Sequence, residues 1–133
     1  MTTVFVAGTF DFLHPGHLHF FAQARTHGGR LVVLVARDET VAYIKGKKPI
    51  HNEQRRLAAV QRCDLVDEAF LGSLTDVFSF LDRVPVDVIC LGYDQRAFTD
   101  RLDDELKRRN LSPKVVRLRP FDPQRWKSSK MKP

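Results

Sequence analysis

The chain has 133 residues, of which 43% are hydrophobic and 29% are charged, with a formal net charge of +6. This length suits a single domain, and the apolar content excludes a wholly disordered chain and a collagen-like repeat. No segment approaches the roughly 20 apolar residues of a membrane-spanning helix, and the N-terminus lacks the layout of a signal peptide, so we expect a soluble cytoplasmic protein.

The excess of positive charge is confined to the end of the chain. Residues 1–113 carry equal numbers of basic and acidic side chains, whereas residues 114–133 are strongly basic. A basic surface spread over a whole domain would indicate a nucleic-acid partner, so such a partner is not expected here. Cys63 and Cys90 show no CxxC spacing, which predicts reduced thiols and no zinc site.

The first predicted unit is a strand, a helix and a second strand. Residues 4–7 and 31–36 are apolar runs typical of parallel strands that are buried on both faces. Between them, side chains at helical spacing predict a helix over residues 16–27. The residues at this spacing are Leu18, Phe21, Ala22 and Arg25.

Helices and strands then alternate to the end of the chain. The predicted elements are a helix over 53–62, a strand over 68–71, a helix over 76–83, a strand over 86–91, a helix over 99–110 and an edge strand over 115–118. Residues 42–52 are interpreted as a basic loop. The pattern predicts one α/β domain over residues 1–133, a Rossmann-like, doubly wound parallel five-stranded sheet in three α/β/α layers.

Residues 8–17, GTFDFLHPGH, join the first strand to the first helix. Ligands of open α/β sheets bind at the carboxyl ends of the strands, so this segment is the candidate site. A helix that begins near Pro15 or Gly16 directs free backbone N–H groups and the positive end of its dipole at this crevice, where they favour a phosphate. Taken as an isolated pair, His14 and His17 are more often helix-start or core residues; the complete motif reverses that interpretation.

This segment matches the GxFDxxHxGH signature of the HxGH nucleotidyltransferase superfamily, and the chain most resembles its archaeal FAD synthetase branch. The resemblance covers most of the chain. It is carried by ARDETV at 36–41, KGKKPI at 45–50, EQRR at 53–56, LGS at 71–73, LGYDQ at 91–95, a charged helix around 103–109 and KSSK at 127–130.

The resemblance implies a set of site residues. His14 and His17 contact the triphosphate and stabilise charge at the α-phosphorus, while Lys45 or Lys47 binds phosphate from the loop; a merely solvated loop is the alternative for these lysines and for Lys48. The implied nucleotide-binding residues are Gly8, Thr9, Phe10, Asp11, Gly16, Arg55, Gly92, Asp94, Ser128 and Ser129. Asp94 lies near the base, and the two serines close over the triphosphate.

The implied reaction explains why histidine, lysine and the end of a helix are enough for catalysis. A phosphate monoester attacks the α-phosphorus of a nucleoside triphosphate, and pyrophosphate leaves. The monoester has a second pKa of about 6 and is already an anion, so catalysis is positioning plus charge stabilisation by imidazolium, lysine and the helix end. Mg²⁺ is carried by the triphosphate, and no protein metal ligands are expected. His19, His27 and His51 are interpreted as surface or satisfied core residues.

Three functions stay open. The first is FMN adenylyltransferase activity, with ATP and FMN as substrates. The second is a cytidylyltransferase that uses CTP and glycerol 3-phosphate or a similar phosphorylated alcohol, although the RTxGIST-like segment of such relatives is altered at residues 125–129. The third, ranked last, is a non-catalytic nucleotide-binding or nucleic-acid-binding module.

The basic tail over residues 119–133 also has two interpretations. Either it closes over the active site, as the resemblance implies, or it is a disordered end. The resemblance also allows a homodimer, because relatives often form one.

Overall fold

A computed structural model describes residues 1–92 and 96–118, without the side chains of residues 96–100. In this part of the chain, five parallel strands form one sheet in the order β3-β2-β1-β4-β5. The strands are β1 (Thr3–Gly8), β2 (Arg30–Val35), β3 (Glu68–Leu71), β4 (Val88–Leu91) and β5 (Lys114–Arg117). The helices are α1 (Pro15–Arg25), α2 (Asp38–Lys45), α3 (Glu53–Gln61), α4 (Phe80–Arg83) and α5 (Arg96–Arg108). The predicted doubly wound sheet, with the last strand at an edge, is confirmed.

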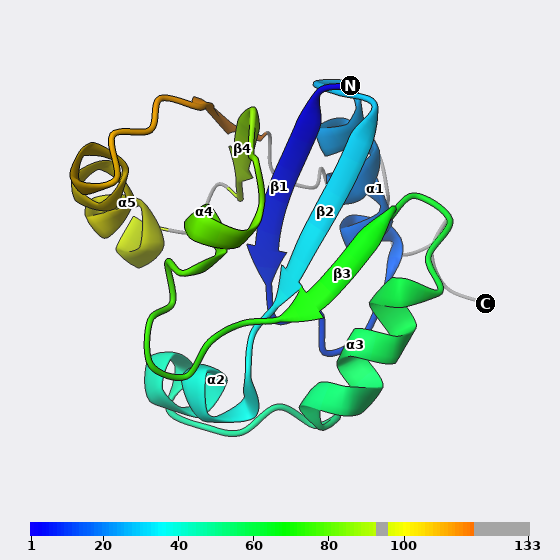
Figure 1. Cartoon of the computed structure of the whole chain (residues 1–133). Coiled ribbons are helices and arrows are strands. Elements are labelled where there is room, and N and C mark those ends of the chain that lie inside the picture. Colours follow the sequence, from blue (N-terminus) through cyan, green and yellow to red (C-terminus); the bar gives the residue numbers. More distant parts are fainter. Residues whose placement is uncertain (93–95, 119–133) are drawn as a thin grey trace.

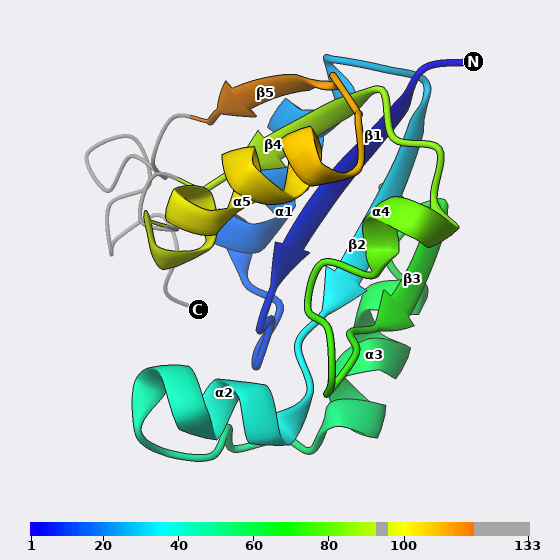
Figure 2. The ribbon, with the colours of Figure 1, turned by 60° about the vertical axis from the view of Figure 1, so that its left-hand side comes forward.

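Helices cover both faces of the sheet and give three layers (Figure 1 and Figure 2). The core on the α1 and α3 side includes Val4, Val6, Phe21, Val33 and Val60. The core on the α4 and α5 side includes Phe5, Val32, Phe80, Leu102 and Leu106. Successive residues of β1 alternate between these cores, as the period of a strand requires, and the rings of Phe5 and Phe80 stack with centroids 3.9 Å apart.

Residues 38–45 form α2, where the sequence interpretation placed part of a basic loop over 42–52. Acidic residues in the first turn stabilise α2, and Gly46 ends it at a φ of 78°, a left-handed conformation that favours glycine. Of the residues of α2, all of which the structure describes, Val41 alone is buried, so no apolar stripe marked the helix. The loop itself is limited to residues 46–52.

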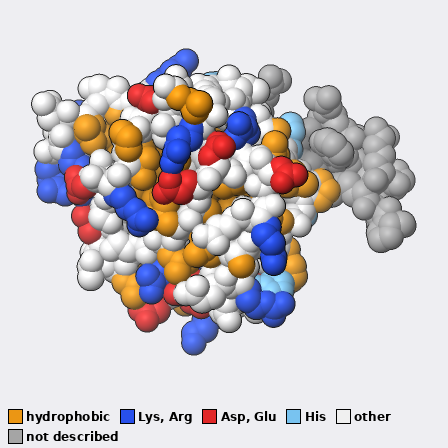
Figure 3. All heavy atoms as spheres, turned by 45° about the vertical axis from the view of Figure 1, so that its right-hand side comes forward, with side chains coloured by type: hydrophobic (Ala, Val, Ile, Leu, Met, Phe, Trp, Pro, Cys, Tyr) orange, Lys and Arg blue, Asp and Glu red, His pale blue; other side chains and the backbone are white. Residues whose placement is uncertain are grey.

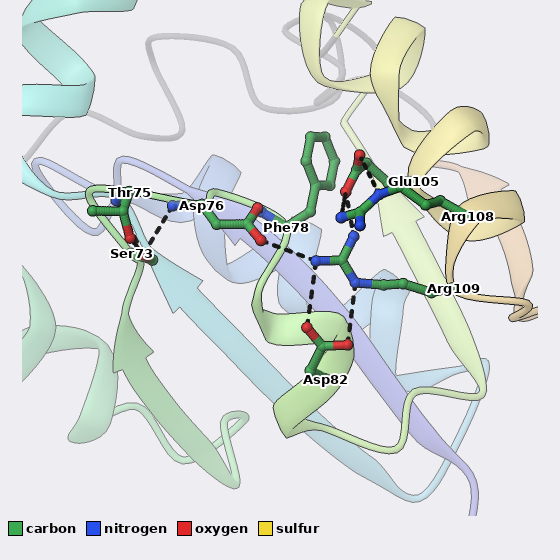
Figure 4. A network of polar contacts seen from close by, with 8 residues as sticks. All are labelled: Ser73, Thr75, Asp76, Phe78, Asp82, Glu105, Arg108 and Arg109. Carbon is green, nitrogen blue, oxygen red and sulfur yellow. Dashed lines mark hydrogen bonds and ion pairs between the residues drawn. The ribbon is translucent and has the colours of Figure 1, made fainter.

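The predicted helix over 76–83 is wrong in its first half. Of these residues, all described by the structure, Phe80–Arg83 alone are helical. The preceding turns are held by side chains: Ser73 Oγ accepts two backbone N–H groups at 3.2 and 3.1 Å, and Asp76 Oδ1 accepts a third at 3.0 Å (Figure 4). Short polar side chains compete with helical hydrogen bonds in this way.

Helix α1 is confirmed, and part of the set of residues at helical spacing is buried. Phe21 and Ala24 are fully buried, whereas Leu18 is 43% exposed and Ala22 is also exposed. Arg25 lies beside the sheet, where Nη1 donates to Asp67 Oδ2 at 2.6 Å. The helical spacing is therefore confirmed, and of the four residues at this spacing, all described by the structure, Phe21 alone is buried.

An ion-pair network fastens the end of α5 to the segment after β3 (Figure 4). Arg109 Nη2 lies 3.0 Å from Asp76 Oδ2, its Nε lies 3.2 Å from Asp82 Oδ1, and its Nη1 contacts Glu105. Arg108 also bonds to Glu105, at 2.9 Å. Hydrogen bonds from these two guanidinium groups lower the pKa of Glu105 to about 2.

The described part of the chain holds no helix with the length and apolar character needed to cross a membrane. Cys63 and Cys90 are free thiols, and burial raises the pKa of Cys90 to about 11.

Gly8, the last residue of β1, has no room for a side chain. A Cβ there would lie 2.7 Å from Cζ of Phe10, whose ring is 5% exposed. We therefore expect Gly8→Ala to lower the free energy of unfolding by about 1–3 kcal/mol, as overpacked cores do, measured by urea denaturation. Gly72→Ala is the matched control, because a Cβ there meets only the end of the Leu34 side chain, at 3.1 Å. Equal losses in both variants would contradict this account.

Candidate active site

The motif segment lies at the carboxyl end of β1, where the strand order of the sheet reverses between β1 and β4. Such a reversal opens the ligand crevice of this type of fold. Phe10 adopts a φ of 52°, rare for a residue with a side chain. Its ring is buried against Phe21, with centroids 5.2 Å apart. The packing of Phe10 against the core thus holds the motif segment in place.

His14 caps α1 with its ring. Nδ1 accepts the backbone N–H of Gly16 at 3.0 Å, and the His14 carbonyl accepts those of His17 and Leu18 at 2.9 and 3.1 Å. Pro15, the first helical residue, has no N–H. The expectation of free N–H groups in the first turn is therefore wrong for this conformation, because His14 bonds each of them. The helix dipole remains directed at the crevice.

The rings of His14 and His17 lie face to face, with centroids 3.9 Å apart and planes inclined by 22°. His14 is exposed, and His17 is half-buried with its ring against Phe10 at 5.3 Å. Since Nδ1 of His14 accepts a hydrogen bond, the neutral ring carries its proton on Nε2. Contact of His14 with a nucleotide stays a prediction.

His17 is uncharged at neutral pH. Burial lowers its pKa to about 4, and electrostatic interactions with His14 and Lys45 act in the same direction. The Phe12 backbone opposes them, but within the described residues no hydrogen bond of ordinary geometry reaches the buried Nδ1. The imidazolium implied by the resemblance is therefore absent from His17 before a ligand binds. The effect of Lys45 also places the charge of this side chain within electrostatic range of His17.

Asp11 ties the motif segment to the loop after α2. Its two carboxylate oxygens accept the backbone N–H groups of Ile50 and His51 at 2.7 and 2.8 Å, and its carbonyl bonds to Nδ1 of His51 at 2.8 Å. Burial acts to raise the pKa of Asp11, but the hydrogen bonds outweigh it and lower the pKa. Contact of Asp11 with the nucleotide stays a prediction.

Arg56 is a buried cation that the sequence analysis did not select. Its side chain is 0% exposed. Nη1 donates to the Thr9 carbonyl at 2.8 Å, Nε to the His51 carbonyl at 3.0 Å and Nη2 to Asp38 Oδ1 at 2.7 Å. These acceptors belong to the motif segment, the loop after α2 and the first residue of α2. Arg56 therefore links the motif segment, α2 and the loop after α2 to one another.

Arg55, the predicted nucleotide-binding arginine, lies exposed on α3. Its backbone N–H donates to Asn52 Oδ1 at 2.9 Å, which caps the helix. Adjacent helical residues face directions about 100° apart, so one arginine of the pair turns inward. Arg56 lies four residues before the fully buried Val60, and this spacing is the sequence signal that selects it.

The N-termini of α2 and α3 also cap each other. Glu53 Oε1 accepts the backbone N–H of Asp38 at 2.8 Å, and Asp38 Oδ2 accepts that of Glu53 at 3.2 Å. Arg37 Nε lies 3.0 Å from the other Glu53 oxygen. Lys45, Lys47 and Lys48 are exposed where α2 ends and the loop begins. The bonds of Asp38 and Asp11 thus support both sides of this lysine segment.

Half of the predicted site residues lie on the one motif segment that follows β1. They are Gly8, Thr9, Phe10, Asp11, His14, Gly16 and His17. Gly92 follows the neighbouring strand β4, where its carbonyl accepts Arg117 Nη1 at 2.8 Å. The predicted residues Asp94, Ser128 and Ser129, and the tail over 119–133, lie outside the described residues. Among the residues described, no three His, Cys, Asp or Glu side chains form a metal-binding group.

Comparisons with known proteins identify the family of the chain. The family model described as cytidylyltransferase-like matches residues 5–132. The chain is 47% identical over 118 residues to a Methanosarcina barkeri protein named FAD synthase, covering 89% of this chain and 84% of that one. It is also 47% identical over 124 residues to the FAD synthase of Methanothermobacter thermautotrophicus, covering 91% and 82%.

A solved structure is also similar. The Thermoplasma volcanium protein described as a lipopolysaccharide core biosynthesis protein superimposes with a TM-score of 0.85 at 38% identity, covering 92% of this chain and 99% of that one.

The burial of Arg56 predicts a large difference between neighbouring arginines. Arg56→Gln leaves Asp38 and two carbonyls without their buried partner, so we expect the free energy of unfolding to fall by about 3–5 kcal/mol. The matched control Arg55→Gln changes an exposed side chain and should lie within about 0.5 kcal/mol of the parent. Urea denaturation followed by circular dichroism measures both. Similar losses would show that the buried guanidinium does not hold the site together.

The pKa of His17 makes stability depend on pH. An unfolded histidine gains its proton near pH 6.5, but folded His17 gains it only near pH 4. Its contribution is therefore complete above pH 6.5 and is lost as the pH falls towards 4, by at most about 3 kcal/mol. We expect His17→Gln to flatten this part of the stability curve, measured by thermal denaturation from pH 7.5 to 4.5. An unchanged slope would assign the dependence to other groups.

Proposed function

Because the chain belongs to the cytidylyltransferase-like family, we propose that it is an FAD synthase that transfers AMP from ATP to FMN. The observation that carries the proposal is the stacked His14 and His17 pair at the crevice, in a chain 47% identical to proteins of that name. The LGYDQ and KSSK segments support the same branch of the family.

The proposed reaction needs no general base. The FMN phosphate, with a second pKa of about 6, is largely a dianion at neutral pH. One of its oxygens attacks the α-phosphorus of ATP, forming the new P–O bond, while the bond from the α-phosphorus to the bridging oxygen breaks. Pyrophosphate leaves with the electron pair of that bond. The protein must therefore orient two anions and stabilise the charge that develops between them.

The described residues suit that task. Nε2 of His14 donates to a phosphate oxygen, and a triphosphate beside His17 raises the pKa of this ring, so that it gains a proton as the substrate binds. Lys45 or Lys47 binds phosphate oxygens from the loop that Asp11 holds in place. The binding of anions thus restores the charge that burial removes from His17.

We propose that Mg²⁺ arrives with the triphosphate. Phosphate oxygens and water are ligands that suit Mg²⁺. The residues that the structure describes contain no group of three His, Cys, Asp or Glu side chains that could hold a metal ion. When bound, the ion neutralises charge on the phosphates. We also propose, from the resemblance, that residues 119–133 close over the triphosphate through Ser128 and Ser129, and that Asp94 lies near the base.

Two other functions, a CTP-dependent transferase and a nucleic-acid-binding module, are tested by the experiment described below. The description of the family model favours CTP as the nucleotide. A nucleic-acid-binding module is less well supported, because basic and acidic side chains alternate over the face drawn in Figure 3, whereas phosphate backbones attract surfaces of one sign.

Purified protein with Mg²⁺, FMN and ATP should form FAD and pyrophosphate, detected by chromatography, and CTP should not replace ATP. We expect His14→Ala and His17→Ala each to lower kcat/KM by about 10²–10³-fold, as the loss of a transition-state donor does. His19→Ala, on the same helix, is the control and should stay within about twofold. FAD formation is to be tried under reducing conditions as well. CTP-dependent transfer, or no transfer from either nucleotide, would overturn the proposal.

A further inference from the structure

Four large hydrophobic side chains lie exposed on the motif segment, α2 and the loop after it, among them Tyr43 at 91%, which ends in a polar hydroxyl. Phe12 is 51% exposed, Ile44 is 66% exposed and Ile50 is 77% exposed. We name these three residues the apolar rim. Large apolar side chains that gather on the surface next to a polar site mark a binding surface more often than isolated ones do.

The bonds of Asp11 bring two members of the rim together. The backbone N–H of Ile50 donates to Asp11 Oδ2 at 2.7 Å, and Asp11 directly precedes Phe12. The Phe12 ring also meets the ring of His51, with centroids 4.4 Å apart and planes inclined by 78°. The Asp11 carboxylate and the contact between the Phe12 and His51 rings therefore hold Phe12 close to the loop that carries Ile50.

Ile44 belongs to the last turn of α2, before the loop that carries Ile50. It follows the buried Val41 by three residues and directly precedes Lys45, so Ile44 and Lys45 flank the inward face of the helix. The charge of Lys45 acts on His17. One end of the rim therefore adjoins the phosphate-binding cations of the site.

The rim lies on one side of the crevice. It borders α2, which follows β2, and the sheet order places β2 and β4 on opposite sides of β1. Figure 2 shows α2 beyond the carboxyl ends of β1 and β2, away from α5. The resemblance places the base of ATP near Asp94, after β4. The rim is thus on the other side of β1 from the proposed base site, and the second substrate can bind there.

We propose that the apolar rim binds the isoalloxazine ring of FMN while the phosphate of FMN lies at Lys45 and His17. This inference rests on the proposed function and names its acceptor subsite. FMN joins an anionic phosphate through a ribityl chain to a flat ring with an apolar dimethylbenzene edge. The site offers cations at one end and exposed apolar surface at the other, which matches that distribution. A small phosphorylated alcohol has no group that uses the rim.

The test compares Phe12→Ser/Ile50→Ser and Ile44→Ser with the parent protein. Flavin fluorescence titration gives the Kd of FMN, and calorimetry gives the Kd of ATP with Mg²⁺. We expect FMN to bind at least about tenfold more weakly to the double variant, with the Kd of ATP within about twofold. Leu111→Ser is the matched control, since Leu111 is 40% exposed beyond the opposite end of the sheet. Ile44→Ser, on a separate element, repeats the test if the double variant does not fold.

The outcomes separate the two proposals. If the parent makes FAD and the double variant binds FMN as tightly as the parent, the rim is not the flavin subsite and the proposed function stands. If the parent neither binds FMN nor makes FAD, both proposals fail. If sedimentation shows a dimer that the double variant dissociates while its FMN affinity is unchanged, the rim is a contact between copies, and the inference is overturned.

Discussion

The site depends on the buried guanidinium of Arg56. A charge removed from water is tolerable only when its donors are satisfied, and the three acceptors of Arg56 come from the motif segment, the loop after α2 and α2 itself. Of these segments, α2, which the structure describes in full, buries Val41 alone among its residues, and the motif segment meets the core through Phe10 and Leu13. One side chain that must find all three acceptors at once therefore selects a single arrangement of segments that hydrophobic burial would leave loosely specified.

This arrangement separates the support of the site from its chemistry. Arg56 and Asp11 use their side chains for hydrogen bonds within the protein, so they hold the segments around the crevice in place. In the proposed function, His14, His17 and Lys45 are the residues that contact the substrates. The buried arginine and the exposed lysine carry the same formal charge, yet one is neutralised by its acceptors and the other is left for a ligand. A charge count from composition cannot distinguish them.

Patterns of burial were predictable from the sequence, and the direction of individual side chains was not. The strands were found because their apolar runs are buried on both faces, whereas α2 was missed because Val41 is its one buried residue in the described structure. The resemblance selected Arg55, but a shift of one helical position decides which arginine turns inward. The capping role of His14 depends on a ring orientation that no spacing reveals, and it changes how the first turn of α1 was interpreted.

The two strands that border the crevice are distant in the chain. The backbone N–H of Thr3 on β1 bonds to Asp87, the residue before β4, across 84 positions. Contacts of such separation form slowly and, during synthesis, late. Until β4 has left the ribosome, one edge of the apolar strand β1 stays unpaired, and an open apolar edge invites association with other chains. A chain that ends before β4 would therefore tend to aggregate before it could bind any nucleotide. The ability to bind a nucleotide is gained in one step, when β4 pairs with β1.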